Sequence, residues 1–213
     1  LRNGWVENHE ESSGGHASAP GKNTPLVRLG KFMADIDKKN PFKAEFTPTV
    51  REMFRRMAPN MDFGMRMIFA NLWLFEGLLL KVLPMISPAA AAMTRTTIAF
   101  TTAKGADGLN VLPQEAYVTA NMRFIHHQPN KECFKLLKHL AKKYDIEVEE
   151  LYNDEPCPIV DYRSDAFHLI EETAAQIYPG VGICPYTMTG GTDAKFYKEI
   201  CENAIRFAPI YID

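Results

Sequence analysis

The sequence lacks the features that mark several large protein classes. Its four cysteines (Cys133, Cys157, Cys184 and Cys201) form no CxxC pair and no Cys/His spacing typical of a zinc finger. It has no P-loop, no HExxH and no GxSxG. It has no block of basic residues, and its net charge is only −2, so we expect no nucleic-acid partner. Free thiols are the plainer interpretation of the cysteines, and disulfides are the alternative.

The chain also has no apolar leader and no clean apolar stretch of membrane length. Leu1 to Ser13 is polar and charged, unlike a signal peptide. The most hydrophobic stretch, Met65 to Met93, is interrupted by charged residues and prolines (Arg66, Glu76, Lys81, Pro84 and Pro88). We read this stretch as a pair of helices with one broad apolar face, and we expect no membrane partner and a cytoplasmic location.

The first half of the sequence shows mainly patterns typical of helices. Residues 1–13 are poorly patterned and predict an irregular leader or an edge strand. Apolar residues at helical spacing predict a helix that begins near Pro25 and ends at Asn40-Pro41. A short helix over 50–57, a longer one over 65–83 and a helical turn at 89–92 follow.

The period then changes to that of strands. Residues 94–103 are rich in β-branched residues, mostly threonine, and residues 115–125 alternate, so both predict strands. A helix from Pro129 and a strand over 146–151 follow. The order is βαββαβ with helices inserted after the first helix, which predicts an α+β, ferredoxin-like fold.

A second region follows a Pro- and Asp-containing linker at 154–165. Here the pattern predicts an α/β fragment with a helix over 165–177, a short strand near 182–185, a helix over 192–200 and a strand over 204–207.

Three segments could carry chemistry, and each has a plainer interpretation. In the first, Gly14 and Gly15 allow a tight turn that exposes His16, whose imidazole can donate to a developing oxyanion. A histidine in a Gly/Ser loop is also an ordinary surface residue. In the second, Asn110 and Arg123 could together hold a carboxylate. They could equally be a turn asparagine and a surface arginine on a strand.

The third segment is Thr189 to Lys195, in which two glycines precede a predicted helix start. Free backbone N–H groups at such a start favour an anion. The plainer interpretation is that Thr192 or Asp193 only caps the helix.

The order GGHAS, NVLP with an arginine 13 residues after its asparagine, and GGTDAKFY resembles the zinc amidohydrolases, such as aminoacylase, carboxypeptidase S and acetylornithine deacetylase. The stretches FANLWLFEGLLLKVLP and AIRFAPIYID are most similar to the carboxypeptidase S branch. The resemblance runs from Gly14 nearly to the end.

The resemblance implies a lid or dimerisation domain at 14–153, after the leader at 1–13, and a C-terminal fragment of the catalytic domain at 154–213. Lid domains of the family form a homodimer, and the histidine of GGHAS reaches the partner's active site. This implies that His16 stabilises the oxyanion in trans. It also implies that Asn110 and Arg123 contact the substrate carboxylate, and that the pocket is lined by Gly191, Thr192, Asp193 and Lys195. Lys195 stands where many relatives have arginine, so the bidentate fork is lost.

The family uses two zinc ions, and its ligands precede the lid or follow the point where this chain stops. The resemblance therefore implies a fragment of a longer enzyme that cleaves a peptide or N-acyl amino acid next to a free carboxylate, with the fragment inactive alone. Two alternatives remain: a non-catalytic dimerisation module, and a ferredoxin-like regulatory domain that binds an amino acid.

Overall fold

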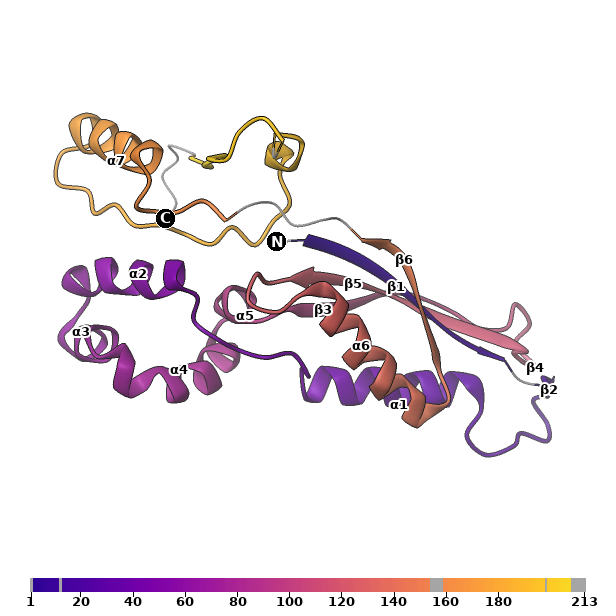
Figure 1. Cartoon of the computed structure of the whole chain (residues 1–213). Helices are drawn as coiled ribbons and strands as arrows, with labels where there is room; N and C mark the ends of the chain where they lie inside the picture. Colours follow the sequence, from indigo (N-terminus) through magenta and orange to yellow (C-terminus); the bar gives the residue numbers. More distant parts are fainter. Residues whose placement is uncertain (1, 12, 154–158, 198, 208–213) are drawn as a thin grey trace. The chain divides into compact units, whose positions relative to one another are not determined.

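The structure, a computed structural model, describes residues 2–11, 13–153, 159–197 and 199–207. The chain divides into two compact units, which we describe separately. The sheet unit contains residues 2–44 and 95–155, and the helical unit contains residues 45–94 and the described residues after 156. Figure 1 shows the helices and strands of both units.

The sheet unit is built on a four-stranded antiparallel sheet in the order β3-β5-β1-β6. Its strands are β1 (Arg2–Glu11), β3 (Thr97–Lys104), β5 (Glu115–Phe124) and β6 (Glu147–Asn153). Of the two alternatives for residues 1–13, a strand is present as β1, but the predicted edge position is wrong because β1 lies inside the sheet. It pairs with β5 from Arg2↔Phe124 to Glu11↔Glu115, and with β6 on its other side. Pairing on both sides stabilises a strand whose own sequence is polar and contains only one β-branched residue, Val6.

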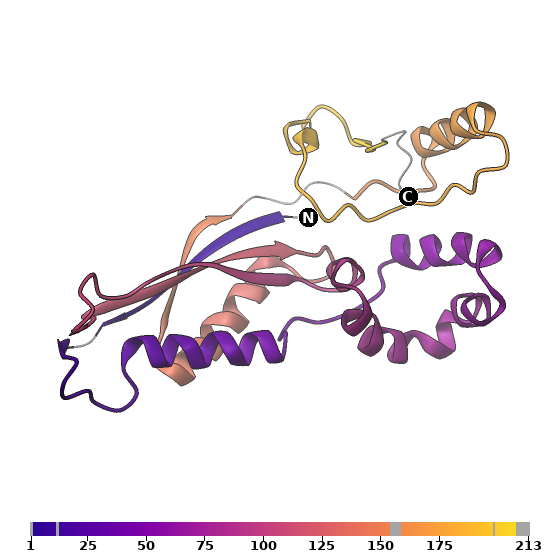
Figure 2. The ribbon, with the colours of Figure 1, turned by 180° about the vertical axis from the view of Figure 1, so that it is seen from behind.

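Helices α1 (Pro25–Lys38) and α6 (Asn130–Ala141) cover one face of this sheet (Figure 2). Along β5 every second residue is buried, from Ala116 to Phe124, so these side chains face the two helices. Phe32 and Leu137 are fully buried in the same core. A single 3₁₀ turn, η2 (Lys142–Tyr144), joins α6 to β6 through Asp145, whose φ is 60°.

The elements of the sheet unit run β1, α1, β3, β5, α6 and β6, with helices inserted between α1 and β3. The predicted strands and helices of this unit are present within a few residues of the predicted ends. The α+β class predicted from the sequence is confirmed.

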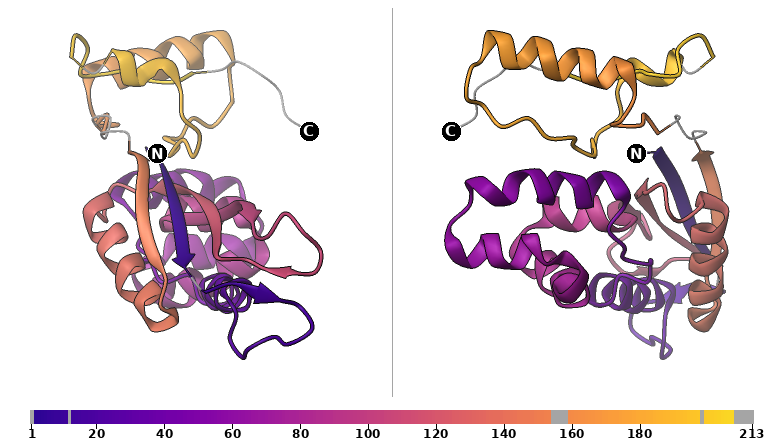
Figure 3. Two further views of the ribbon diagram at one scale, coloured as in Figure 1. Left: turned by 90° about the vertical axis from the view of Figure 1, so that its right-hand side faces the viewer. Right: turned by 60° about the vertical axis from the view of Figure 1, so that its left-hand side comes forward.

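The helical unit begins with the inserted helices, whose successive turns Figure 3 shows. They are α2 (Pro48–Met57), the 3₁₀ turn η1 (Ala58–Asn60), α3 (Phe63–Ala70), α4 (Leu72–Ile86) and α5 (Pro88–Thr94). Buried residues of α2, α3 and α4 form a separate apolar core, in which Phe54 stacks on Phe69 at 4.4 Å between ring centroids.

The single helix predicted over residues 65–83 is wrong, because α3 and α4 are two helices bent by 108° at Asn71. The Asn71 side chain donates to the carbonyl of Met67 at 2.8 Å, and its backbone leaves the helical region at φ −114° and ψ 43°. An asparagine side chain that competes for backbone carbonyls favours such a break. No single described helix is long and apolar enough to cross a membrane, while α3 and α4 taken together pass that test by length and composition only.

The rest of the helical unit contains α7 (Asp165–Ile177), as predicted, and one 3₁₀ turn, η3 (Asp193–Phe196). The strands predicted near 182–185 and 204–207 are absent from the described residues, and the helix predicted over 192–200 is reduced to η3. A strand is stable only with a hydrogen-bonded neighbour, and the described part of this unit supplies none. Arg56 of α2 forms ion pairs with Glu52 and with Glu171 of α7, which joins the inserted helices to this segment.

Candidate functional site

Two of the three candidate segments meet in a second, small sheet. Strand β2 (Gly15–His16) pairs antiparallel with β4 (Val111–Leu112), so that His16 lies opposite Val111. The Ala17 N–H also donates to the carbonyl of Asn110 at 2.9 Å. This pairing brings GGHAS and NVLP side by side near the end of the main sheet where β1 ends and β5 begins. We call these two segments, residues 14–18 and 110–113, the tip.

The two glycines of the tip are required by its backbone. Gly14 has φ 66° and Gly15 has φ 152°, a region that residues with a Cβ atom rarely adopt. A Cβ added to Gly14 would also lie 2.7 Å from Cγ of Gln114. Glycines at both positions therefore allow the chain to turn sharply into β2 and present His16.

The His16 imidazole is exposed and is oriented by Ser18. The backbone N–H of Ser18 donates to Nδ1 at 3.1 Å, and Ser18 Oγ lies 2.8 Å from the same nitrogen. A backbone N–H can only donate, so Nδ1 is the acceptor nitrogen and the neutral ring carries its proton on Nε2. The sequence analysis assigned Ser18 no role, although its place two residues after the histidine in GGHAS is the signal that could have indicated one.

Asn110 adds a second donor beside this ring. Its Nδ2 lies 3.5 Å from His16 Nε2, and both side chains are exposed. With the proton on Nε2, both atoms are donors, so they can serve one shared acceptor oxygen. The tip is therefore suited to bind a carboxylate or an oxyanion that belongs to another molecule.

Arg123 lies elsewhere in the sheet unit. It is on β5, eight residues beyond Glu115, the end of β5 nearest the tip (123 − 115 = 8). At ~3.4 Å per residue this is about 27 Å along the strand. The side chain alternates with the buried residues, so it is on the face of β5 opposite α1 and α6. The structure of one chain therefore does not bring Asn110 and Arg123 together on one carboxylate.

The third candidate segment belongs to the helical unit. Gly191 and Asp193 are exposed, and Thr192 Oγ accepts a hydrogen bond from Arg206 Nε. The Lys195 ammonium lies 5.1 Å from the ring centroid of Phe196. The Thr192 side chain does not cap η3, contrary to the plainer interpretation of that residue. With only four residues, η3 also has no aligned helix dipole to favour an anion.

The described residues contain no group of three or more His, Cys, Asp or Glu side chains that could hold a metal ion. Zinc needs three or four such ligands converging at ~2.0–2.3 Å. The part of this chain that the structure describes therefore does not fit a zinc ion.

Comparisons with known proteins agree on a family of peptidases and related hydrolases. A family model described as a peptidase dimerisation domain matches residues 4–149, a range that includes most of β1 and both segments of the tip. The chain is 30% identical over 202 residues to the human N-fatty-acyl-amino acid synthase/hydrolase PM20D1, covering 93% of this chain and 40% of that protein. It is 28% identical over 204 residues to the probable carboxypeptidase S-like 2 of Dictyostelium discoideum, covering 94% and 38%.

Comparison with solved structures supports the fold of the chain and nothing further. A metallo-carboxypeptidase of the M20 family from Sulfolobus solfataricus, Sso-CP2, aligns with a TM-score of 0.54 at 17% identity, over 93% of this chain and 55% of that one. The dipeptidase Dug1p of Saccharomyces cerevisiae aligns with a TM-score of 0.56 at 12% identity, over 93% and 45%. The chain spans about two fifths of the length of the curated relatives it matches.

Proposed function

The chain belongs to the peptidase dimerisation domain family, and from this we propose that it is part of a longer zinc-dependent hydrolase. In this proposal the sheet unit with the inserted helices forms the dimerisation domain, and the residues after 154 belong to the catalytic domain. The longer protein cleaves a peptide or an N-acyl amino acid next to a free carboxylate. Names of the relatives, which include a carboxypeptidase S-like protein and an N-acyl amino acid hydrolase, support this substrate class.

The convergence of His16 and Asn110 carries the proposal. They are 94 residues apart in sequence, yet the structure places their donor nitrogens 3.5 Å apart on an exposed tip. The tip needs two glycines with positive φ to exist. A purely structural turn does not require two side-chain donors directed at a common point.

The chemistry follows from the tautomer of His16. When the carbonyl of a substrate amide is attacked, its oxygen gains negative charge, and the Nε2–H of His16 donates to it. Donors fixed in advance at such an oxygen stabilise the transition state more than the ground state. Asn110 donates to the same oxygen or to the substrate carboxylate. In this proposal the ligands of the two zinc ions belong to residues of the longer protein outside this chain.

We further propose that His16 acts on the active site of a partner subunit in a homodimer. The exposure of the tip supports this, because a molecule outside this chain can reach the side chains of His16 and Asn110. In this proposal Arg123, about 27 Å along β5, contacts a carboxylate at a different place from the tip of the same chain.

The first test replaces His16 with alanine in the longer protein. We expect kcat to fall about 10²- to 10³-fold, the usual loss for one oxyanion donor. His139→Ala is the matched control, because His139 is an exposed histidine on α6. Equal kcat values for His16→Ala and His139→Ala would show that His16 has no such role.

The second test asks whether His16 acts in trans, by mixing two inactive variants and allowing subunits to exchange. In a His16→Ala/Lys195→Ala heterodimer, one active site receives an intact tip and an intact Lys195, so activity returns to at most about half of wild type. In a His16→Ala/Asn110→Ala heterodimer every site receives a damaged tip, so activity stays low. Failure of the first mixture to recover, with exchange verified by mass, contradicts action in trans.

The third test concerns the 213-residue chain itself. Because its described residues do not fit a zinc ion, we expect no hydrolysis of an N-acyl amino acid even with zinc added. Turnover by this chain alone contradicts the proposed division of labour.

A further inference from the structure

Helix α4 has apolar side chains on every side, with Glu76 and Lys81 as its only charged residues, although only one side is buried. Leu72 and Leu79 are buried in the core of the helical unit, and Phe75, Leu80 and Leu83 pack against that core. On the opposite side Trp73 is 78% exposed, Leu78 is 59% exposed and Met85 is 85% exposed. A helix on a protein surface ordinarily carries polar side chains on its outer face.

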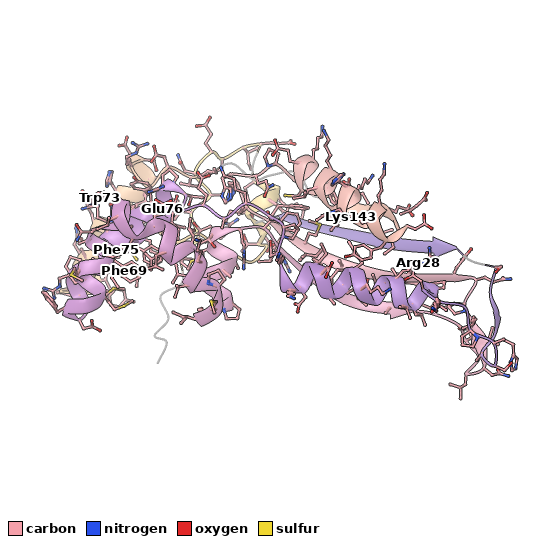
Figure 4. The ribbon with its side chains drawn as sticks, turned by 90° about the horizontal axis from the view of Figure 1, so that it is seen from below. Arg28, Phe69, Trp73, Phe75, Glu76 and Lys143 are labelled. Atoms are coloured by element: carbon pink, nitrogen blue, oxygen red, sulfur yellow. The ribbon has the colours of Figure 1, made fainter. Side chains whose placement is uncertain are left out.

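The exposed residues of α4 form one continuous stripe. Leu74, Leu78 and Met85 recur at spacings of four and seven residues, and Trp73 precedes Leu74. Ile86 extends the stripe at the C-terminal end, and Lys81 lies within it. In α3, Phe63 and Met67 are exposed as well. Figure 4 labels Trp73 beside Glu76 and Phe75 on this helix. Single exposed apolar residues are ordinary, whereas a continuous patch of this kind indicates a surface that another phase or molecule covers. We call the exposed apolar residues of α4 the apolar face.

The exposed charges on α3 and α4 are basic, and the exposed acid beside them is Asp62 at the start of α3. Arg66 and Lys81 are exposed on α3 and α4. The acid within α4, Glu76, is only 21% exposed and is paired with Arg51 of α2. Asp62 caps α3 by accepting the Met65 N–H at 3.1 Å. The outer side of α4 therefore combines large apolar side chains with a lysine and no exposed carboxylate.

We propose that the apolar face binds the surface of a phospholipid bilayer that contains anionic lipids, with α4 lying in the plane of the interface. Helices of this type bury apolar side chains among the acyl chains and place Lys and Arg at the headgroups. Tryptophan is enriched at that depth. The expectation of no membrane partner was based on spanning segments alone. Helix α4 has 15 residues, about 22 Å at ~1.5 Å per residue, which is too short to span but sufficient to lie on a surface.

The same charges argue against a second copy of this chain as the occupant. Two copies that met through the outer side of α4, about an axis near Leu78, would bring the Lys81 residues of both chains together. Like charges at a buried interface oppose association. Anionic headgroups instead neutralise Lys81.

Vesicle sedimentation of the 213-residue chain tests the proposal, with phosphatidylcholine vesicles that contain or lack about one third phosphatidylserine. We expect binding that is stronger to the anionic vesicles and weakens at high salt. Leu78→Ser should weaken it about tenfold, a fraction of the effect of burying a leucine fully. Leu169→Ser is the matched control, because Leu169 is a 64% exposed leucine on α7, and it should leave binding unchanged.

Charge and depth are tested separately. Lys81→Glu should weaken binding to anionic vesicles about tenfold and should change binding to neutral vesicles little. Lys131→Glu on α6 is the control, and it should leave binding to both kinds of vesicle unchanged. Trp73→Phe should keep binding but remove the blue shift of tryptophan fluorescence that vesicles cause.

Three results would overturn the proposal. The first is no binding to either vesicle. The second is equal binding by Leu78→Ser and wild type. The third is a longer protein that does not bind although the 213-residue chain does, because another part of the protein then covers the face. A change from dimer to monomer in Leu78→Ser, without vesicle binding by wild type, would assign the face to a second copy instead. None of these readouts involves hydrolysis, so they do not depend on the proposed function.

Discussion

Replacing Glu52 with glutamine tests how the helical unit is held together. The Glu52 carboxylate accepts hydrogen bonds from Arg55 Nε at 2.7 Å and from Arg56 Nε at 2.6 Å. The hydrogen bond from Arg55, opposed by burial and aided by Arg56, lowers the pKa of Glu52 from 4.5 to about 2. Its side chain is only 12% exposed. Arg56 also pairs with Glu171, so these charges connect α2 to α7.

The magnitude follows from linkage. The pKa of Glu52 is about 2.5 units lower in the folded than in the unfolded chain. At ~1.36 kcal/mol per unit, this contributes about 3 kcal/mol to the free energy of unfolding at neutral pH. Arg55 is 69% exposed, so water screens its interaction with Glu52. We therefore expect a contribution of about 2 kcal/mol to the free energy of unfolding. Because the folded pKa is the lower one, this stability is present above pH 4.5 and is lost as the pH falls toward 2, with about half gone near pH 3.

Urea unfolding of the 213-residue chain between pH 7 and pH 3 measures this contribution. The wild-type free energy of unfolding should exceed that of Glu52→Gln by about 2 kcal/mol at pH 7, and the difference should shrink as the pH falls. Glu172→Gln, at an exposed acid on α7, is the control. A difference between wild type and Glu52→Gln that stays constant down to pH 3 would refute the reasoning.

Three further predictions concern the core and the tip. Phe32→Ala, at a fully buried ring that packs edge-to-face on Phe100, should cost about 3–5 kcal/mol in urea unfolding; a loss under 1 kcal/mol would contradict the assigned core. Gly14→Ala should strain the turn by about 1–2 kcal/mol and lower kcat of the longer protein; unchanged kinetics would show that the tip does not need this turn. Asn110→Ala should raise KM about tenfold, the effect of a lost hydrogen bond to a charged group; a change in kcat alone would instead assign Asn110 to the oxyanion.

The sheet unit was largely predictable because its strands and helices carry clear periodicity. Residues 115–125 alternate, and the structure gives β5 as Glu115–Phe124 with every second side chain buried. Strand β1 was misjudged because its stability comes from β5 and β6, which are distant in sequence and pair with it on both sides. Periodicity within a segment carries no information about neighbours of that kind.

The helical unit was less predictable for two physical reasons. The apolar run through Asn71 reads as one helix, and only the hydrogen bond from Asn71 to Met67 shows where the backbone turns. The strands predicted after residue 180 need a sheet to join, and the described residues of this unit form none.

Of the candidate site, the sequence indicated the chemistry of single residues but not which of them meet. The spacing of GGHAS and NVLP did not show that β2 and β4 pair, which the structure shows directly. Asn110 and Arg123 were considered as a pair that holds one carboxylate, whereas the extended conformation of β5 carries Arg123 away from the tip.

The central position of β1 has a consequence for how the chain acquires its structure during synthesis. The residues of β1 leave the ribosome before their partners on β5, which follow 104 to 122 residues later (115 − 11 = 104 and 124 − 2 = 122). The helices within residues 45–94 depend on contacts between residues close in sequence, so they can form before the strands of the sheet pair. At about 5–20 residues per second, an unpaired β1 persists for roughly 5 to 25 seconds. The polar sequence RNGWVENHEE, which made β1 hard to recognise, is one that resists aggregation over such an interval.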